Sequence, residues 1–271
     1  MLITAILDAE SEIQSFELTK IALTELISLA ESPMDQSALR SLEPARWDLP
    51  QVHAKNTMRA IFTDANLASV TFAFVERSFA VAVHGFTSPI FPIRNSSIML
   101  FDALLTRALG QKYARQDIDP AAPNRSVSSK VFFAKFPQLY TYLLDQLRWD
   151  VVRFAEEGVE NTGLYPILTL LSRLDVTKTY DSGKYTGMHA FRPLIRECLH
   201  GKVWKIRAMA ARCVPVVIDP DDLEEEIAGM FAAFRLDSQN ALHGELMGIK
   251  RLVEFYSFRT RKDVVFGMIR I

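Results

Sequence analysis

The sequence predicts an all-α fold in which pairs of helices stack side by side, and three observations support this. Apolar residues recur with the helical period along nearly all 271 residues, and no adjacent segments alternate as a β-hairpin would. Glycine, at 11 residues, is too sparse for a β architecture with many turns. A weak internal repeat also runs through the helices, as described below. The composition, 49% hydrophobic and 23% charged, is that of an ordinary folded protein.

The first elements are marked mainly by proline. The apolar stretch after Met1 indicates that the chain starts inside a helix. An apolar stripe predicts the next helix over residues 13–30, and Pro33 ends it because proline cannot continue a helix. Pro50 then begins a helix over residues 51–63.

Two glycines mark the ends of the next two helices. We expect a helix over residues 69–84, with Gly85 as its left-handed C-terminal cap. An amphipathic helix follows, with Pro92 in its first turn and Gly110 directly after its last residue, Leu109.

In the second half, Pro137 restarts the helical pattern. The pattern predicts helices over residues 138–157, 165–174, 189–199, 203–217, 221–234 and 238–256. The helix over residues 221–234 has the clearest start signal, because acidic residues after Pro220 face the positive end of the helix dipole.

Three stretches lack the helical period. They lie near residues 34–49, 111–136 and 175–187. A loop as long as residues 111–136 inside a helical array is usually functional or disordered. We therefore interpret residues 1–271 as one helical-repeat segment with three irregular insertions.

The internal repeat can be aligned on two Ile-Arg pairs, Ile93-Arg94 and Ile206-Arg207. In both, an arginine in the first turn precedes small residues and then an apolar face. Helical repeats of the HEAT and armadillo type are built this way, since small residues let neighbouring helices approach closely. The sequence thus favours an α-solenoid of HEAT/armadillo-like repeats. An irregular helical bundle is the alternative.

Motifs for catalysis are absent from the sequence. It contains no glycine-rich phosphate loop, no GxSxG and no HExxH. Its five histidines are scattered, and Cys198 and Cys213 have no ligand spacing, so we expect buried thiols in a reducing compartment. The acidic cluster at residues 221–226 is better explained by the helix dipole and solvation than by a metal. We expect no catalytic, cofactor-binding or metal-binding residue.

Binding is the remaining function, and two groups of residues are candidates for it. Arg94 and Asn95, with Arg59, could contact a phosphate or a partner carboxylate through bidentate hydrogen bonds. The interpretation we favour for Arg94 is structural, with its guanidinium bridging adjacent repeats through an acidic residue.

The second group is a basic strip with a tryptophan inside it, which could follow a nucleic-acid backbone. Its residues are Lys202, Trp204, Lys205, Arg207 and Arg212, and a solvated helix face is the alternative interpretation. Lys130 and Lys135, with Arg115 and Arg125, could extend the positive surface. A net charge of −1 means that any such attraction is local.

Four segments in order resemble the THADA-like family (thyroid adenoma-associated protein and its fungal counterparts in tRNA modification). They are residues 51–67, 85–107, 130–140 and 203–212. The resemblance implies a central piece of a very long solenoid that is a non-catalytic partner of an FtsJ-type methyltransferase. That enzyme 2′-O-methylates a nucleotide of the tRNA anticodon loop, and it, not this chain, would bind S-adenosylmethionine. No stretch of the sequence reaches the roughly eighteen uninterrupted apolar residues needed to span a bilayer, so we expect no membrane segment and a cytoplasmic protein.

One departure from the family concerns the start of the chain. Family members carry an Arg-Arg-Ser-Ala-Gly-Leu-Pro segment, which we expect directly before a stretch such as residues 2–7, so the resemblance implies a truncated fragment. The alternative function is a generic HEAT-repeat adaptor for protein partners that does not bind RNA. An independent enzyme is the third class, and it would require turnover by the chain alone.

Overall fold

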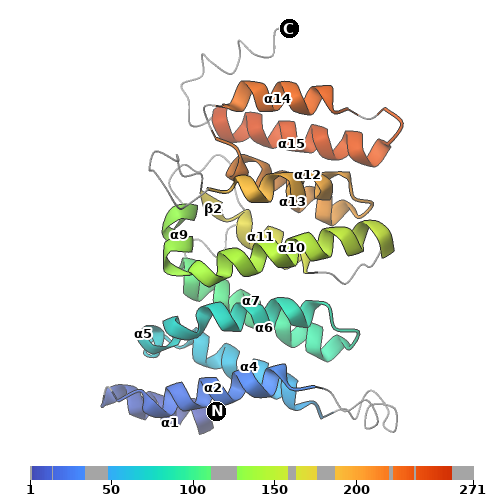
Figure 1. The fold of residues 1–271 in the computed structure, drawn as a ribbon. Helices are drawn as coiled ribbons and strands as arrows, with labels where there is room; N and C mark the ends of the chain where they lie inside the picture. Colours follow the sequence, from blue (N-terminus) through green and yellow to red (C-terminus); the bar gives the residue numbers. More distant parts are fainter. Residues whose placement is uncertain are drawn as a thin grey trace. The chain divides into compact units, whose positions relative to one another are not determined.

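The computed structural model describes residues 2–13, 15–33, 48–110, 127–157, 163–175, 187–219, 222–234 and 236–257. The chain divides into two compact units, Met1–Gln111 and Lys112–Ile271, and the expectation of one helical-repeat segment stays a prediction. Each unit consists mainly of helices over its described residues (Figure 1). The all-α class is therefore confirmed.

The first unit is a stack of helices in which α7 packs against both α4 and α6, and α2 packs against α4. Fully buried side chains at these contacts include Met58, Phe62, Phe79 and Leu100. The elements are α1 (Leu2–Glu12), α2 (Glu17–Glu31), α4 (Pro50–Thr63), α5 (Ala68–Thr71), η2 (Phe72–Phe74), α6 (Val75–Phe86) and α7 (Phe91–Leu109).

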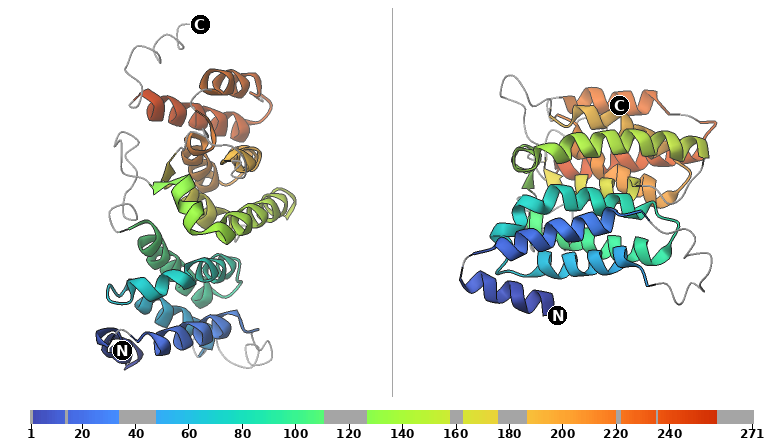
Figure 2. Two further views of the ribbon diagram at one scale, coloured as in Figure 1. Left: turned by 60° about the vertical axis from the view of Figure 1, so that its left-hand side comes forward. Right: turned by 60° about the horizontal axis from the view of Figure 1, so that its bottom comes forward.

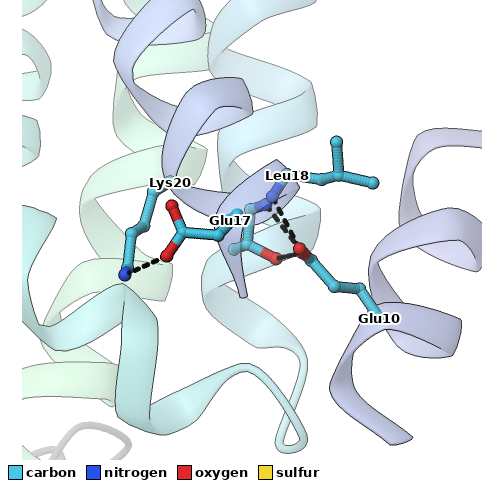
Figure 3. A network of polar contacts seen from close by, with 5 residues as sticks. Glu10, Glu17, Leu18 and Lys20 are labelled. Atoms are coloured by element: carbon cyan, nitrogen blue, oxygen red, sulfur yellow. Dashed lines mark hydrogen bonds and ion pairs between the residues drawn. The ribbon is translucent and has the colours of Figure 1, made fainter. Parts of the chain in front are cut away.

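The start of α2 is held by a carboxylate from α1. Phe16, before the first residue of α2, adopts a left-handed conformation with φ 58° and makes no side-chain cap. Glu10 takes over this role: its carboxylate accepts hydrogen bonds from the backbone N–H groups of Leu18 (2.6 Å) and Thr19 (2.8 Å). Figure 3 shows this contact beside the Lys20–Glu17 ion pair. The helix starts at residue 17 and not at 13 as predicted, because the break at Phe16 separates it from α1.

Glu10 is buried, and burial acts to raise the pKa of its carboxyl. The hydrogen bonds from Leu18 and Thr19 outweigh that effect and hold the pKa below its ordinary value. The ionised form of Glu10 is therefore the one that stabilises the α1–α2 pair.

The helix predicted over residues 69–84 is interrupted, and the role predicted for Gly85 is wrong. A 3₁₀ turn, η2, separates α5 from α6. Gly85 lies inside α6 and is not a left-handed cap. A Cβ at this position would come within 2.8 Å of Ser97 Cβ on α7, an atom fixed to its own backbone, so glycine is required here for close packing of the two helices.

Helix α7 agrees with its prediction. Pro92 is in the first turn, where its missing N–H costs no helical hydrogen bond. Gly110 follows the last residue with φ 90°, a conformation that favours glycine. Helix α4 likewise begins at Pro50 and ends at Thr63, which confirms the expected span.

The second unit is centred on α13, which packs against α11, α12 and α15. The two views of Figure 2 also show the orange and red helices of this unit next to one another. The elements are β1 (Val127–Ser128), α9 (Ser129–Lys135), α10 (Pro137–Glu157), α11 (Leu164–Leu171), β2 (Leu174–Asp175), η3 (His189–Phe191), α12 (Arg192–His200), α13 (Trp204–Val217), α14 (Leu223–Ala232) and α15 (Gln239–Ser257).

Most helix predictions in this unit are confirmed, but two details differ. The stretch 111–136, predicted to be irregular, contains the helix α9 at its end, where Phe132 and Phe133 are buried. The pattern was too short to show a period. A parallel ladder of two residues, β1 with β2, was not predicted either. Residues 34–47, 111–126 and 176–186 of the three expected insertions lie outside the described residues.

Both cysteines are buried free thiols, as the sequence predicted. Cys213 donates to the carbonyl oxygen of Leu168 at 3.1 Å, which joins α13 to α11. Burial raises the pKa of the Cys198 thiol to about 12, so it stays protonated and unreactive. No helix among the described residues has the length and apolar character needed to cross a membrane.

Candidate nucleic-acid interface

Arg94 lies in the first turn of α7 and is half-buried. Its Nη1 donates a hydrogen bond of 2.7 Å to the carbonyl oxygen of Ser88, in the turn between α6 and α7. Its guanidinium carbon lies 5.9 Å from the centre of the Phe91 ring. Arg94 therefore fixes the turn that leads into its own helix, and it also contacts the aromatic residue one turn before it.

Arg207 makes the equivalent contact in the second unit. Its Nη1 donates to the carbonyl oxygens of Gly201 (2.7 Å) and Lys202 (2.8 Å), in the turn between α12 and α13. Its Nε donates to His243 Nδ1 at 3.4 Å. The side chain is only 7% exposed, and burial lowers the pKa of its guanidinium. Its donors are thus directed into the fold.

The two arginines share one local geometry, which we name the arginine clamp: Arg94 to Ser88, and Arg207 to Gly201 and Lys202. Each donates to a carbonyl six residues before it. Each helix also follows a residue of extended backbone, Ile90 or Val203. The Ile-Arg repeat seen in the sequence is therefore a structural repeat. The prediction that Arg94 pairs with an acidic residue is wrong, because the backbone carbonyl of Ser88 accepts its hydrogen bond.

Three residues of the predicted basic strip remain on the surface. Lys202, Trp204 and Lys205 are all exposed, and 58% of Trp204 is accessible. Neither lysine has an ion-pair partner within the part of the chain that the structure describes. Arg207 is buried in its clamp, and Arg212 is half-buried with Nη1 4.0 Å from Met209 Sδ. The exposed positive charge of the strip is therefore carried by Lys202 and Lys205, which precede and follow Trp204 in the sequence.

A hollow of about 220 Å³ adjoins this surface. Lys202 and Phe154 of α10 are among the residues that line it. A Cβ at Gly201 would lie 2.5 Å from the Phe154 ring, so a larger residue here would require this side chain to shift. The remaining residues that line it are Val151, Glu197, Cys198 and His200.

A cluster around the buried carboxylate of Glu245 adjoins the hollow through His200, and the sequence did not reveal it. Glu245 of α15 has no exposed surface, and its Oε1 accepts a hydrogen bond from His200 Nε2 at 2.7 Å. Arg196 Nε lies 3.8 Å from the same oxygen. The pair therefore joins the C-terminal end of α12 to α15. Glu226 is likewise buried and forms an ion pair with Arg192, so the explanation of the acidic cluster by solvation is wrong for this residue.

The candidates of the first unit lie on neighbouring helices. Arg59 of α4 is exposed, and its Nη1 is 3.8 Å from Met99 Sδ on α7. Asn95 is also exposed, on the outer face of α7, where Phe91 and Ile98 are exposed as well. This face combines one cation with apolar side chains. Lys130 and Lys135 lie exposed on α9, in the second unit.

Lys55 is a buried cation that sequence reasoning missed. It lies on α4, is 3% exposed, and burial lowers its pKa to about 8. The amine lies close to Gly85, where α6 packs against α7: a Cβ added to Gly85 would be 3.2 Å from Lys55 Nζ. Within the helix pattern, Lys55 is on the apolar face, and this is the signal that could have identified it.

The described residues contain no group of histidine, cysteine and carboxylate side chains that could hold a metal ion. Chemically, the exposed residues offer two ammonium groups, an indole ring and a nearby hollow. Such a set can bind a phosphate and stack on a planar ring.

Comparison with known proteins identifies the family. The model of the family "THADA/TRM732, DUF2428" matches residues 1–92, and that of "Trm732, C-terminal TPR repeats" matches residues 94–252. The chain belongs to the THADA/Trm732 family. The second description names helical repeats of the TPR type, so the helical-repeat class is confirmed, although the repeat named differs from HEAT or armadillo. No solved structure matches the chain.

Relatives from a fungus and from animals cover nearly all of the chain. It is 35% identical over 264 residues, 97% of its length, to the "tRNA (32-2'-O)-methyltransferase regulator trm732" of Schizosaccharomyces pombe. It is 32% identical over 94% of its length to the human regulator named THADA. The chain spans 17% of the first relative and 13% of the second. Both names describe regulators of a methyltransferase, in agreement with the expectation of a non-catalytic chain.

Proposed function

We propose that this chain is part of a non-catalytic scaffold that partners an FtsJ-type methyltransferase in 2′-O-methylation of the tRNA anticodon loop. The observation that carries the proposal is the similarity, over nearly all of the chain, to proteins named as regulators of tRNA (32-2′-O)-methyltransferase. In this proposal S-adenosylmethionine is bound by the partner. The chain acts in the cytoplasm, a reducing compartment that suits its two free thiols.

The contribution of the scaffold is orientation. A protein that holds a flexible RNA loop in one geometry can lower the barrier of the partner's reaction without supplying a reacting group. The exposed side chains described above support this role, because they can bind RNA but form no catalytic constellation.

The RNA-contacting surface that we propose contains Lys202, Trp204 and Lys205 of the second unit. Lys130 and Lys135 of α9, and Arg59 and Asn95 of the first unit, are further candidates for contact with RNA or the partner. Arg94, Arg207 and Arg212 are left out, because their guanidinium groups are at least half-buried and the first two bond to backbone carbonyls. Positive charge on exposed lysines gives affinity that falls with salt, since bound phosphates release their counterions.

The experiment is a tRNA-binding titration with the purified chain at several salt concentrations. The charge reversal Lys202→Glu with Lys205→Glu removes two phosphate contacts, so the slope of log affinity against log salt should decrease by about 1.4 for a single-stranded site. The matched control reverses Lys20 and Lys250, which are exposed and lie beside Glu17 and Glu254. An unchanged slope in the first variant would contradict the proposed surface.

A generic adaptor that binds only proteins is the second candidate. It is favoured by the apolar side chains exposed on α10, Trp149 and Val152. In that case the purified chain would bind the methyltransferase but would show no tRNA binding, even at low salt.

A further inference from the structure

The helices that carry the arginine clamps both begin with an exposed aromatic residue. Phe91 is the first residue of α7, and Trp204 is the first residue of α13. Their exposed fractions are 66% and 58%. In sequence the two sites read Phe-Pro-Ile-Arg and Trp-Lys-Ile-Arg. The repeat therefore includes a surface ring as well as the buried arginine.

The clamp holds the backbone next to the ring. In the second unit, Arg207 bonds to the two carbonyls just before α13, and the N–H groups of Ile206 and Arg207 both donate to the carbonyl of Val203. The backbone is therefore hydrogen-bonded both before and after Trp204, the first residue of the helix. A planar side chain on a fixed backbone loses little entropy when another ring stacks on it.

Charge distinguishes the two sites. Trp204 lies between Lys202 and Lys205, both exposed and without an ion-pair partner in the described chain. Phe91 is preceded and followed by uncharged residues over 88–93, and the guanidinium of Arg94 beside it is already hydrogen-bonded to Ser88. The pairing of an exposed ring with free cations thus occurs at Trp204 and not at Phe91.

The hollow adds a boundary on one side of this site. Lys202 and Phe154 both line it. Glu197 and His200 also line the hollow, and His200 is bonded to Glu245. The carboxylate of Glu197 repels phosphate, so the positive side of the site is the one with the two lysines.

We propose that Trp204 is a stacking platform for an unpaired nucleobase, with Lys202 and Lys205 binding the phosphates on either side of that nucleotide. This inference rests on the proposed function, because it specifies which part of an RNA the scaffold holds. Aromatic stacking contributes to single-strand binding irrespective of base identity, whereas lysines contribute through charge alone. The two contributions can therefore be measured separately.

The experiment compares Trp204→Ala with two matched controls, Trp149→Ala and Phe91→Ala. The first control removes an exposed tryptophan of the same unit, and the second removes the aromatic residue at the equivalent repeat position. Binding of a single-stranded RNA heptamer should weaken about 5-fold to 150-fold in Trp204→Ala, the range for loss of one stacked base. Both controls should bind as the wild type does, and Trp204→Phe should recover part of the loss.

A second measurement tests stacking directly. In a chain with Trp47→Phe and Trp149→Phe, Trp204 is the one remaining tryptophan. Its fluorescence should be quenched by the heptamer, and an abasic oligomer of equal charge should quench less. Equal affinity of Trp204→Ala and wild type, or equal quenching by both oligomers, would overturn the stacking proposal.

The outcomes separate this inference from the proposed function. If the chain binds no RNA, both fail. If it binds RNA with the expected salt dependence but Trp204→Ala has no effect, only the stacking platform is wrong. If Trp204→Ala loses binding to the purified methyltransferase and keeps RNA affinity, Trp204 belongs to a protein interface and the inference is refuted.

Discussion

The hydrogen bonds of the two arginine clamps predict how much stability is lost when each arginine is removed. Arg207 is 7% exposed, and Arg207→Ala removes a guanidinium that donates to two backbone carbonyls and to His243. A hydrogen bond from a charged donor contributes about 1.5–3 kcal/mol, and Arg207 makes more than one such bond. We expect a loss of about 3–4 kcal/mol in the free energy of unfolding of the second unit.

Arg94→Ala should cost less. Arg94 is half-buried, and its one backbone hydrogen bond goes to Ser88. The contact with Phe91 adds at most about 1 kcal/mol. We expect a loss of about 2 kcal/mol, and Arg94→Lys should recover part of it, since one ammonium can still reach one carbonyl. Arg207→Lys should recover little, because lysine cannot reproduce the fork of donors.

Urea unfolding followed by circular dichroism measures both losses. Hydrogen exchange of backbone amides in α7 and α13 assigns each loss to its unit. The clamp assignment would be refuted by an Arg207→Ala chain that unfolds at the wild-type urea concentration, or by a larger loss in Arg94→Ala than in Arg207→Ala. Unchanged stability with lost RNA affinity would show instead that the guanidinium contacts RNA.

Three further predictions concern buried groups. Because burial lowers the pKa of Lys55 to about 8, its amine loses its proton at a lower pH in the folded state than in the unfolded state. The free energy of unfolding should therefore rise by about 3 kcal/mol between pH 8 and pH 10.4. Urea titrations of Lys55→Met should lack this rise, and an equal rise in wild type and variant would contradict the prediction. Gly244→Ala would place a Cβ 1.8 Å from the carbonyl oxygen of Leu199, so thermal melting should show a loss of at least ~2 kcal/mol; wild-type melting would refute the close approach. Glu10 has a lowered pKa, so its stabilisation is present above the unfolded pKa and is lost as pH falls through the folded one; Glu10→Gln should flatten the acid branch of the melting curve, and an unchanged branch would exclude the cap.

The helices could be predicted where a local signal marks them. Pro50, Pro92 and Gly110 each restrict the backbone by their own chemistry, and the helices next to them begin or end as expected. The Ile-Arg repeat was also visible, because an arginine four residues into a helix has the same local surroundings in both places.

Features that depend on a distant segment could not be predicted. The requirement for Gly85 comes from Ser97 on another helix, so the residue looked like an ordinary helix end. The start of α2 depends on Glu10, and the burial of Glu226 depends on Arg192.

The candidate interface was predicted in part. The sequence identified Lys202, Trp204 and Lys205, which are exposed, but it also included Arg207, which is buried. Residue type alone does not tell whether a basic side chain faces water or a backbone carbonyl. Lys55 was missed for the opposite reason, because a lysine is usually assumed to be exposed.

The central claim is that the chain assists methylation by binding RNA and leaves the chemistry to a partner. A reconstituted assay tests it most directly, with purified chain, FtsJ-type methyltransferase, tRNA and radiolabelled S-adenosylmethionine. We predict that methyl transfer to the anticodon loop requires the methyltransferase, increases when the chain is added, and increases less with the Lys202→Glu and Lys205→Glu variant. Methyl transfer by the chain alone, or an equal increase with that variant, would contradict the account.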